Sequence, residues 1–329
     1  MKVTLFLALV LVPCSWLHSA EVQLKTTSGI LHGTLEVTND RKKSRVVLII
    51  PGSGPTDRDG NTAGLPGRNN SLKYLAESLL QSGTPSLRID KRGIGKSFGA
   101  APQERDLRFE SYVYDVIEWI RHLRAEGYGQ VFVLGHSEGA LVGLLAAQQE
   151  GVDGYISVAG TARPASKLIL EQLRSKLPAD LLTQAESILD QLDKGHQVRD
   201  TPAALNALFR SSVQPYLISW TKYDPAQEIA KVASPVLIIQ GSTDIQVSIS
   251  DAEMLHKHKL GSELSLIEGM NHVLKSVGPD LQEQVASYSD PKLPLHEKIT
   301  TAISDFIEKN QKSVQSSTAP TFDGPTPSK

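Results

Sequence analysis

Short runs of β-branched residues alternate with segments of helical periodicity along most of this chain, and this alternation decides its fold class. Strands that alternate with helices form a mostly parallel sheet with helices packed on its faces. Several of the runs contain no polar residue, which is typical of strands buried on both faces. A chain of 329 residues is long enough to bury one large core of this kind.

The first two predicted strands differ from the rest, because a tight turn joins them. Residues 22–26 and 30–37 flank Ser28-Gly29, and this turn pair predicts an antiparallel hairpin at one edge of the sheet. The other predicted strands are residues 46–50, 86–89, 131–134, 155–158, 236–239 and 264–267. Apolar side chains recur at helical spacing in residues 72–79, 113–123 and 299–307, which predicts helices there.

One long segment interrupts the alternation. Residues 163–227 carry leucines at helical spacing without a strand pattern, so we expect a helical cap inserted after a strand. The segment after Asn310 is rich in Ser, Thr and Pro with few apolar residues, a composition typical of a disordered tail. The predicted organisation is a signal peptide (1–20), a first part of the α/β core (21–162), the helical cap (163–227), a second part of the core (228–310) and a disordered tail (311–329).

The N-terminus has the pattern of a signal peptide. Met1-Lys2 precedes an apolar run over residues 3–12, and His18-Ser19-Ala20 precedes the expected cleavage position. We therefore expect an exported protein, periplasmic or secreted. The run is shorter than the roughly 20 residues of a membrane span, so no stable membrane insertion is expected. Cleavage would remove the only cysteine, Cys14. Lipid attachment at Cys14 is the second interpretation, although Pro13 stands where a small residue is expected.

Charge and histidine spacing exclude several classes of function. The chain has 34 Lys and Arg against 36 Asp and Glu, a formal net charge of -2, so no basic surface for nucleic acid is expected. His256 and His258 lie two residues apart in a predicted helix and point away from each other, which makes them poor joint metal ligands. The sequence predicts no metal site and no cofactor, and it leaves the oligomeric state open.

One motif indicates nucleophilic chemistry. A predicted strand over residues 131–134 runs directly into Gly135-His136-Ser137-Glu138-Gly139 and then into a helical pattern over residues 140–148. A G-x-S-x-G motif between a strand and a helix holds its serine in a sharp turn, and the glycines let neighbouring backbone approach closely. The motif alone also occurs as an ordinary glycine-rich turn. Its place after a strand favours Ser137 as a nucleophile.

A serine nucleophile needs a base and a carboxylate that orients the base. Asp244 and His272 each lie in the loop after a predicted strand, so both are expected at the same sheet edge as Ser137. The order Ser, Asp, His along the chain is that of the α/β hydrolases. Asp224 and Asp251 are weaker candidates for the acid, and an ordinary turn aspartate is the alternative role for Asp244.

The tetrahedral intermediate of such a reaction needs two backbone N–H donors for its negative charge. We expect one from Glu138, directly after the nucleophile, and the other from Ser53 in the loop Pro51-Gly52-Ser53-Gly54-Pro55. A Gly/Pro turn without a role is the alternative for this loop, which is no phosphate cradle because no Gly-Lys-Ser/Thr follows. The run Asp57-Arg58-Asp59 is interpreted as an ion-pair cluster that holds the loop, with substrate contact as the alternative.

Two of these segments resemble a known family. Residues 51–61, PGSGPTDRDGN, together with GHSEG, are similar to a bacterial family of α/β-hydrolase carboxylesterases. Residues 88–97 and 288–295 look like further features of it, and the resemblance covers roughly residues 22–310. It implies an α/β-hydrolase fold and hydrolysis of short-chain acyl esters. The family's site residues carry over to Ser137, Asp244 and His272 as the triad and to Ser53 and Glu138 as oxyanion donors.

The sequence therefore predicts a serine carboxylesterase that hydrolyses small-molecule acyl esters through an acyl-enzyme intermediate. Aminopeptidases, thioesterases and lipases share the fold and are the alternatives. The leucine-rich cap favours an apolar acyl pocket, and no acidic cluster in it marks a site for a peptide amino group. A non-catalytic ligand-binding homologue is less favoured, because the triad and both oxyanion positions are present.

Overall fold

A computed structural model describes residues 18–37, 43–101, 103–174 and 176–311. Their centre is an eight-stranded sheet with the order β1-β2-β4-β3-β5-β6-β7-β8. The strands are β1 (His18–Thr26), β2 (Gly29–Val37), β3 (Arg45–Ile50), β4 (Ser86–Ile89), β5 (Gln130–His136), β6 (Gly154–Val158), β7 (Val236–Gly241) and β8 (Glu263–Ile267). The pairs β1–β2 and β2–β4 are antiparallel, and all other pairs are parallel. This confirms the predicted fold class with its hairpin at one edge.

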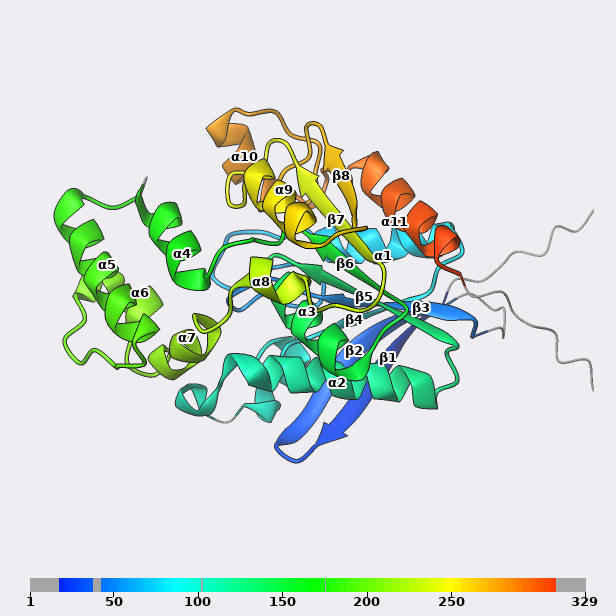
Figure 1. Ribbon diagram of the computed structural model, residues 1–329, viewed down its shortest axis with the longest axis horizontal. Helices are drawn as coiled ribbons and strands as arrows, with labels where there is room; N and C mark the ends of the chain where they lie inside the picture. The colour runs from blue at the N-terminus through cyan, green and yellow to red at the C-terminus, as the bar shows by residue number, and fades with distance from the viewer. Residues whose placement is uncertain (1–17, 38–42, 102, 175, 312–329) are drawn as a thin grey trace, which may run out of the picture.

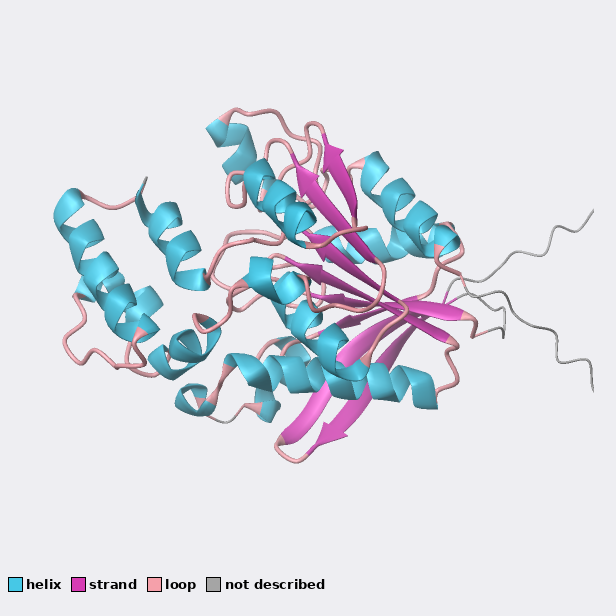
Figure 2. Ribbon diagram, in the orientation of Figure 1, coloured by secondary structure: helices cyan, strands magenta, loops and turns pink. Residues whose placement is uncertain are grey.

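Helices cover both faces of the sheet (Figure 2). One face packs against α1 (Ser71–Gln81) and α11 (Glu297–Lys309). The other packs against α2 (Phe109–Ala125), α3 (Glu138–Glu150), α8 (Pro225–Ile229) and α9 (Ile249–His258). The central strand β3 is buried along nearly its whole length, as its continuous apolar sequence predicts.

Between β6 and β7 the described chain forms helices and no strand. They are α4 (Ala165–Arg174), α5 (Ala179–Asp193), the short 3₁₀ turn η3 (Ala203–Leu205), α6 (Asn206–Phe209) and α7 (Gln214–Trp220), followed by α8. Figure 1 shows α4 to α6 grouped to the left of the sheet, with α7 between them and α2. This helical insertion docks through aromatic rings: Trp220 of α7 stacks on Phe109 of α2, with ring centroids 5.8 Å apart.

The first strand begins earlier than its sequence pattern predicts. β1 starts at His18 rather than Val22, and its ladder pairs Ser19 with Glu36 and Ala20 with Leu35. The last three residues of the predicted signal peptide are therefore strand residues here. Residues 1–17, with Cys14, and residues 312–329, which make up nearly all of the predicted tail, lie outside the described residues, so the predictions made for them stay predictions.

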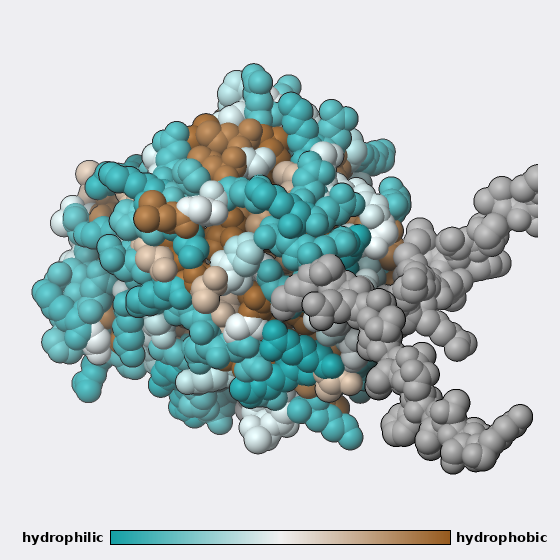
Figure 3. Space-filling model, turned by 45° about the vertical axis from the view of Figure 1, so that its right-hand side comes forward, coloured by the Kyte–Doolittle hydropathy of each residue, from teal (hydrophilic) through white to brown (hydrophobic). Residues whose placement is uncertain are grey.

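The remaining short elements lie in loops around the sheet: η1 (Gly95–Ala100), η2 (Glu104–Asp106) and α10 (Leu281–Ser287). No helix within the described residues has the length and apolar character that crossing a bilayer requires. Figure 3 shows hydrophilic side chains over most of the face in view, with apolar side chains gathered in smaller patches.

Candidate active site

Ser137 lies in a strained turn between β5 and α3. Its backbone has φ 56° and ψ -122°, a conformation that a residue with a side chain rarely adopts. The turn depends on the two glycines of the motif. A Cβ on Gly135 would lie 2.1 Å from the carbonyl oxygen of Gly139, and a Cβ on Gly139 would lie 2.5 Å from that of Pro51. The glycines therefore serve the close backbone approach expected from the sequence.

Asp244 and His272 meet at the same edge of the sheet. Asp244 follows β7 and His272 follows β8, and a backbone hydrogen bond of 3.1 Å from Thr243 to Met270 ties the two loops together. His272 Nδ1 donates to Asp244 Oδ2 at 2.8 Å, with both side chains buried. Ser137 and His272 line one cavity. The structure thus brings the three predicted triad residues to one place.

The environment of Asp244 keeps it ionised. Burial alone would raise its pKa, but the charge of His272 and hydrogen bonds from His272, Val247 and Gln246 outweigh burial and hold the pKa below its usual value. The backbone N–H groups of Gln246 and Val247 donate to Oδ1 at 2.7 and 3.0 Å, and Gln240 donates to Oδ2 at 3.0 Å. A fixed anion at this place orients the imidazole and stabilises its protonated form.

The two weaker candidates for the acid have other partners. Asp224 caps α8 by accepting hydrogen bonds from the backbone of Ala226 and Gln227. Asp251 is paired with Arg163, with Oδ2 2.8 Å from Nη2, and fixes the start of α9. Both carboxylates are thus engaged at helix starts.

His136 is a residue of the motif to which the sequence analysis gave no role. Its Nε2 donates to the carbonyl oxygen of His272 at 2.8 Å, and the two rings are 4.9 Å apart. Burial, followed by the charge of His272, lowers the pKa of His136 to about 4, so the ring is neutral at physiological pH. His136 therefore links the turn at Ser137 to the loop that carries His272.

The two residues expected to supply oxyanion donors lie near Ser137: Glu138 follows it in the chain, and a Cβ on Gly52, next to Ser53, would lie 3.2 Å from Ser137 Cβ. Glu138 is the first residue of α3, where backbone N–H groups have no partner within the helix and the helix dipole favours an anion. Ser53 is exposed at the start of its loop, and its N–H has no acceptor in the part of the chain that the structure describes. Both residues line the cavity next to Ser137.

That cavity has a volume of about 470 Å³ and mostly apolar walls. The apolar side chains come from α3 and from the helical insertion and include Leu141, Leu168, Ile169, Leu217 and Trp220. A second cavity of about 410 Å³ shares Glu138 and Tyr216 with the first and continues past Ile94 and Phe98. Ser137 thus lines a largely apolar cavity that lies next to a second one.

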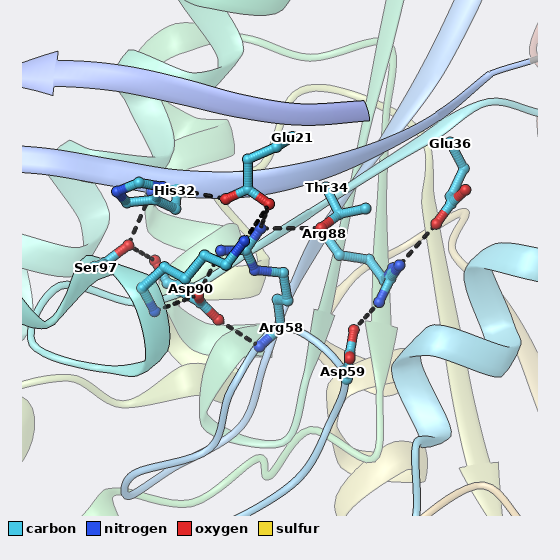
Figure 4. A network of polar contacts seen from close by, with 10 residues as sticks. Glu21, His32, Thr34, Glu36, Arg58, Asp59, Arg88, Asp90 and Ser97 are labelled. Carbon is cyan, nitrogen blue, oxygen red and sulfur yellow. Dashed lines mark hydrogen bonds and ion pairs between the residues drawn. The ribbon is translucent and has the colours of Figure 1, made fainter. Parts of the chain in front are cut away.

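A network of ion pairs braces the loop after β3 (Figure 4). Arg58 Nη2 lies 2.6 Å from Asp90 Oδ2, and the backbone N–H of Arg58 donates to Oδ1 of the same carboxylate at 2.8 Å. Arg58 also pairs with Glu21 of β1 at 3.1 Å, and Asp59 pairs with Arg88. The contacts of the Asp57-Arg58-Asp59 run thus agree with its interpretation as a brace for the oxyanion loop.

Two more residues of the site had no assigned role from sequence. Lys91 lies within the 88–97 segment that resembles the family, but nothing in the pattern indicates what its ammonium group contacts. Tyr216 lies in α7, and its hydroxyl donates to Glu138 Oε1. Within the described residues no three His, Cys, Asp or Glu side chains form a group that could hold a metal ion.

The sheet order, the strained serine after β5 and the Asp–His pair on the loops after β7 and β8 place this protein among the α/β hydrolases. A sequence model of the family described as "Serine aminopeptidase, S33" matches residues 64–276, more than half of the chain. The chain belongs to this hydrolase family.

Two proteins similar in sequence to this chain are described as an esterase and a lipase homolog. The esterase EstD of Thermotoga maritima is 27% identical over 256 residues, which cover 76% of this chain and 59% of that protein. The chain thus matches less than two thirds of this relative's length. A monoglyceride lipase homolog of Monkeypox virus is 24% identical over 222 residues, or 64% of this chain and 79% of that protein.

Solved structures share the fold. Est1E from Butyrivibrio proteoclasticus with bound ferulic acid has a TM-score of 0.59 at 18% identity, with 88% of this chain and 98% of that chain covered. The Pyrococcus furiosus esterase Pf2001 has a TM-score of 0.56 at 15% identity, with 90% and 92% covered. At these identities the likeness concerns the fold alone.

Proposed function

We propose that this protein is a serine carboxylesterase with Ser137, Asp244 and His272 as its triad. The observation that carries the proposal is the 2.8 Å hydrogen bond between His272 Nδ1 and Asp244 Oδ2, in a chain where His272 and the strained Ser137 line one cavity. A nucleophile, its base and an orienting carboxylate need this arrangement. The esterase relative supports the choice of an ester as substrate.

The reaction follows from these positions. His272 takes the proton of the Ser137 hydroxyl through Nε2 while Oγ forms a bond to the ester carbonyl carbon. The N–H groups of Ser53 and Glu138 donate hydrogen bonds to the carbonyl oxygen as negative charge develops on it. His272 then gives its proton to the departing alcohol as the ester C–O bond breaks, leaving an acyl-serine. A water molecule then attacks the acyl carbon while His272 takes one of its protons. His272 returns this proton to Oγ of Ser137 as the bond between Oγ and the acyl carbon breaks, which releases the acid and restores Ser137.

The volume of the cavity limits the size of the acyl group that the site can bind. A cavity of roughly 150 Å³ holds one benzene ring, so a volume of about 470 Å³ exceeds what a short acyl chain needs. We therefore extend the proposed substrates from short to medium-length acyl esters of small alcohols. The protein acts, on this proposal, after export, in keeping with its predicted signal peptide.

A peptidase is the second candidate, because the matching family model is described as a serine aminopeptidase. A free peptide amino group needs a carboxylate partner. Of the described residues that line the cavity beside Ser137, Glu138 alone is a carboxylate, and Lys91 and Tyr216 already engage it. This arrangement favours an ester over a peptide.

The test is hydrolysis of a series of p-nitrophenyl esters from acetate to palmitate, with amino acid p-nitroanilides measured in parallel. We expect hydrolysis of the short and medium esters and a loss of activity in Ser137→Ala. Ile169→Trp, which fills part of the cavity, should shift the optimum to shorter chains without abolishing acetate hydrolysis. Turnover of the anilides without the esters would establish the peptidase instead, and equal ester hydrolysis in Ser137→Ala would refute the nucleophile.

A further inference from the structure

Lys91 follows β4 and has a buried ammonium group with three distinct partners. Nζ lies 2.6 Å from the carbonyl oxygen of Gly52 and 2.8 Å from Oε2 of Glu138. It also lies 5.0 Å from the centre of the Tyr112 ring. The side chains of Lys91 and Glu138 are each only 2% exposed. An ammonium group has three N–H donors. Lys91 uses one of them for the Glu138 carboxylate and another for the neutral backbone carbonyl of Gly52.

The two hydrogen-bonded partners belong to the two halves of the oxyanion hole. The carbonyl of Gly52 and the N–H of Ser53 are parts of one peptide group, and Glu138 carries the other proposed N–H donor. A cation on the carbonyl oxygen draws electron density from the peptide nitrogen and makes its N–H a stronger donor, as in any chain of hydrogen bonds at low dielectric. A single side chain thus contacts the peptide group that carries one proposed donor and the side chain of the residue that carries the other.

We propose that Lys91 is a positioning residue that activates the oxyanion hole by polarising the Gly52–Ser53 peptide and by holding it at a fixed place relative to Glu138. This inference rests on the proposed esterase function. On this proposal Lys91 acts through the Gly52–Ser53 peptide and not on the reacting atoms themselves. Its effect is largest when charge develops on the carbonyl oxygen, so it stabilises the transition state more than the bound substrate.

Glu138 has a second partner, which links the hole to the helical insertion. The hydroxyl of Tyr216 in α7 donates to Oε1 while Lys91 holds Oε2. Burial and the charge of Glu138 raise the pKa of Tyr216 well above its usual value, so this hydroxyl remains a donor. Both carboxylate oxygens are therefore engaged, and the side chain cannot turn toward the cavity as a base.

A simpler role for Lys91 is to neutralise the buried carboxylate of Glu138, and the two roles predict different double variants. Removing Lys91 alone leaves an unpaired buried charge, which is costly under either role. Removing both charges relieves that cost. Glu138→Gln alone also leaves an unpaired buried charge, that of Lys91. If neutralisation is the whole role, the double variant is therefore at least as active as Glu138→Gln; if the lysine polarises the peptide, the double variant is less active.

The experiment compares wild type, Glu138→Gln and the double variant Lys91→Met/Glu138→Gln on an ester that wild type hydrolyses, with active sites counted by a fluorophosphonate. We expect the double variant to have a kcat about tenfold or more below that of Glu138→Gln, with KM within about twofold. Lys91→Gln in the same background restores a neutral donor to Gly52 and should lie between the two. A kcat of the double variant equal to or above that of Glu138→Gln would overturn the proposal.

A transition-state mimic separates positioning from a loss of fold. An alkyl boronic acid adds to Ser137 and places an oxygen in the hole, so its Kd should rise by the same factor as kcat/KM falls. Lys259→Met is the matched control: its ammonium also binds a backbone carbonyl, that of Val232, away from the site, and should leave kcat unchanged. A boronate Kd equal in the double variant and Glu138→Gln would refute the role. If the wild-type protein hydrolyses no ester, the proposed esterase function itself is refuted.

Discussion

Acidification should destabilise this protein through one buried histidine, His136. Its folded-state pKa is about 4, against an ordinary value of 6.5, because burial and the neighbouring charge of His272 disfavour the protonated ring. The unfolded chain therefore binds more protons between these two values. Stability from this group is complete above pH 6.5 and is lost progressively as the pH falls toward 4.

The size of the effect follows from the two pKa values. Proton linkage for a shift from 6.5 to about 4 gives a loss in unfolding free energy of about 2 kcal/mol between pH 8 and pH 5. His136→Gln removes the titrating ring and keeps an N–H donor for the carbonyl of His272. The variant should therefore lose about 2 kcal/mol less than wild type over the same interval.

Urea unfolding at pH 8 and pH 5 measures this difference. Both proteins contain the same other titrating groups, so the comparison isolates His136, provided the dependence on urea concentration has the same slope in each. Equal losses of stability in wild type and His136→Gln would refute the reasoning. They would mean that the ring is solvated in the folded protein or is protonated at little cost.

Three further predictions concern the triad, the turn and the brace. Asp244→Asn should lower kcat by about 10⁴-fold with little change in KM, because the base loses its orienting anion; a loss below tenfold in steady-state assays would contradict this. Gly139→Ala, whose added methyl meets carbonyl oxygens at 2.5 and 2.6 Å, should cost about 3 kcal/mol in urea unfolding, whereas Gly99→Ala, with nothing within 4 Å, should cost at most about 0.5. Arg58→Ala leaves the buried carboxylate of Asp90 without its main cation and should cost about 3–5 kcal/mol; an unchanged Tm would argue against a bracing role.

The sequence predicts the sheet well because each strand has a local signal. All eight predicted strands are present, and Asp244 and His272 could be chosen because each follows a strand at the edge where parallel strands end. The early start of β1 was not predictable, since His18 to Ala20 carry no strand signal of their own. Their pairing with β2 alone makes them strand residues.

The missed site residues share a different property, which is that their roles depend on contacts distant in sequence. Lys91 and Glu138 are 47 positions apart, and Tyr216 and Glu138 are 78 positions apart. No periodicity or spacing rule connects such pairs. His136 is harder still, because its partner is a backbone carbonyl, which any residue at position 272 would offer.

The hydroxyl of Tyr216 has a consequence for how this scaffold diversifies. The helical insertion is one continuous segment between β6 and β7, and the three residues of the proposed triad lie outside it. Exchanging the insertion is therefore a direct route to new substrates. The hydrogen bond from Tyr216 to Glu138 limits which insertions can be exchanged. A transplanted insertion must place a hydrogen-bond donor where the Tyr216 hydroxyl lies. Otherwise Oε1 of the buried Glu138 carboxylate loses its partner and only Oε2 remains bonded. Evolution and protein engineering are therefore free to vary this segment, with Tyr216 as the position to keep.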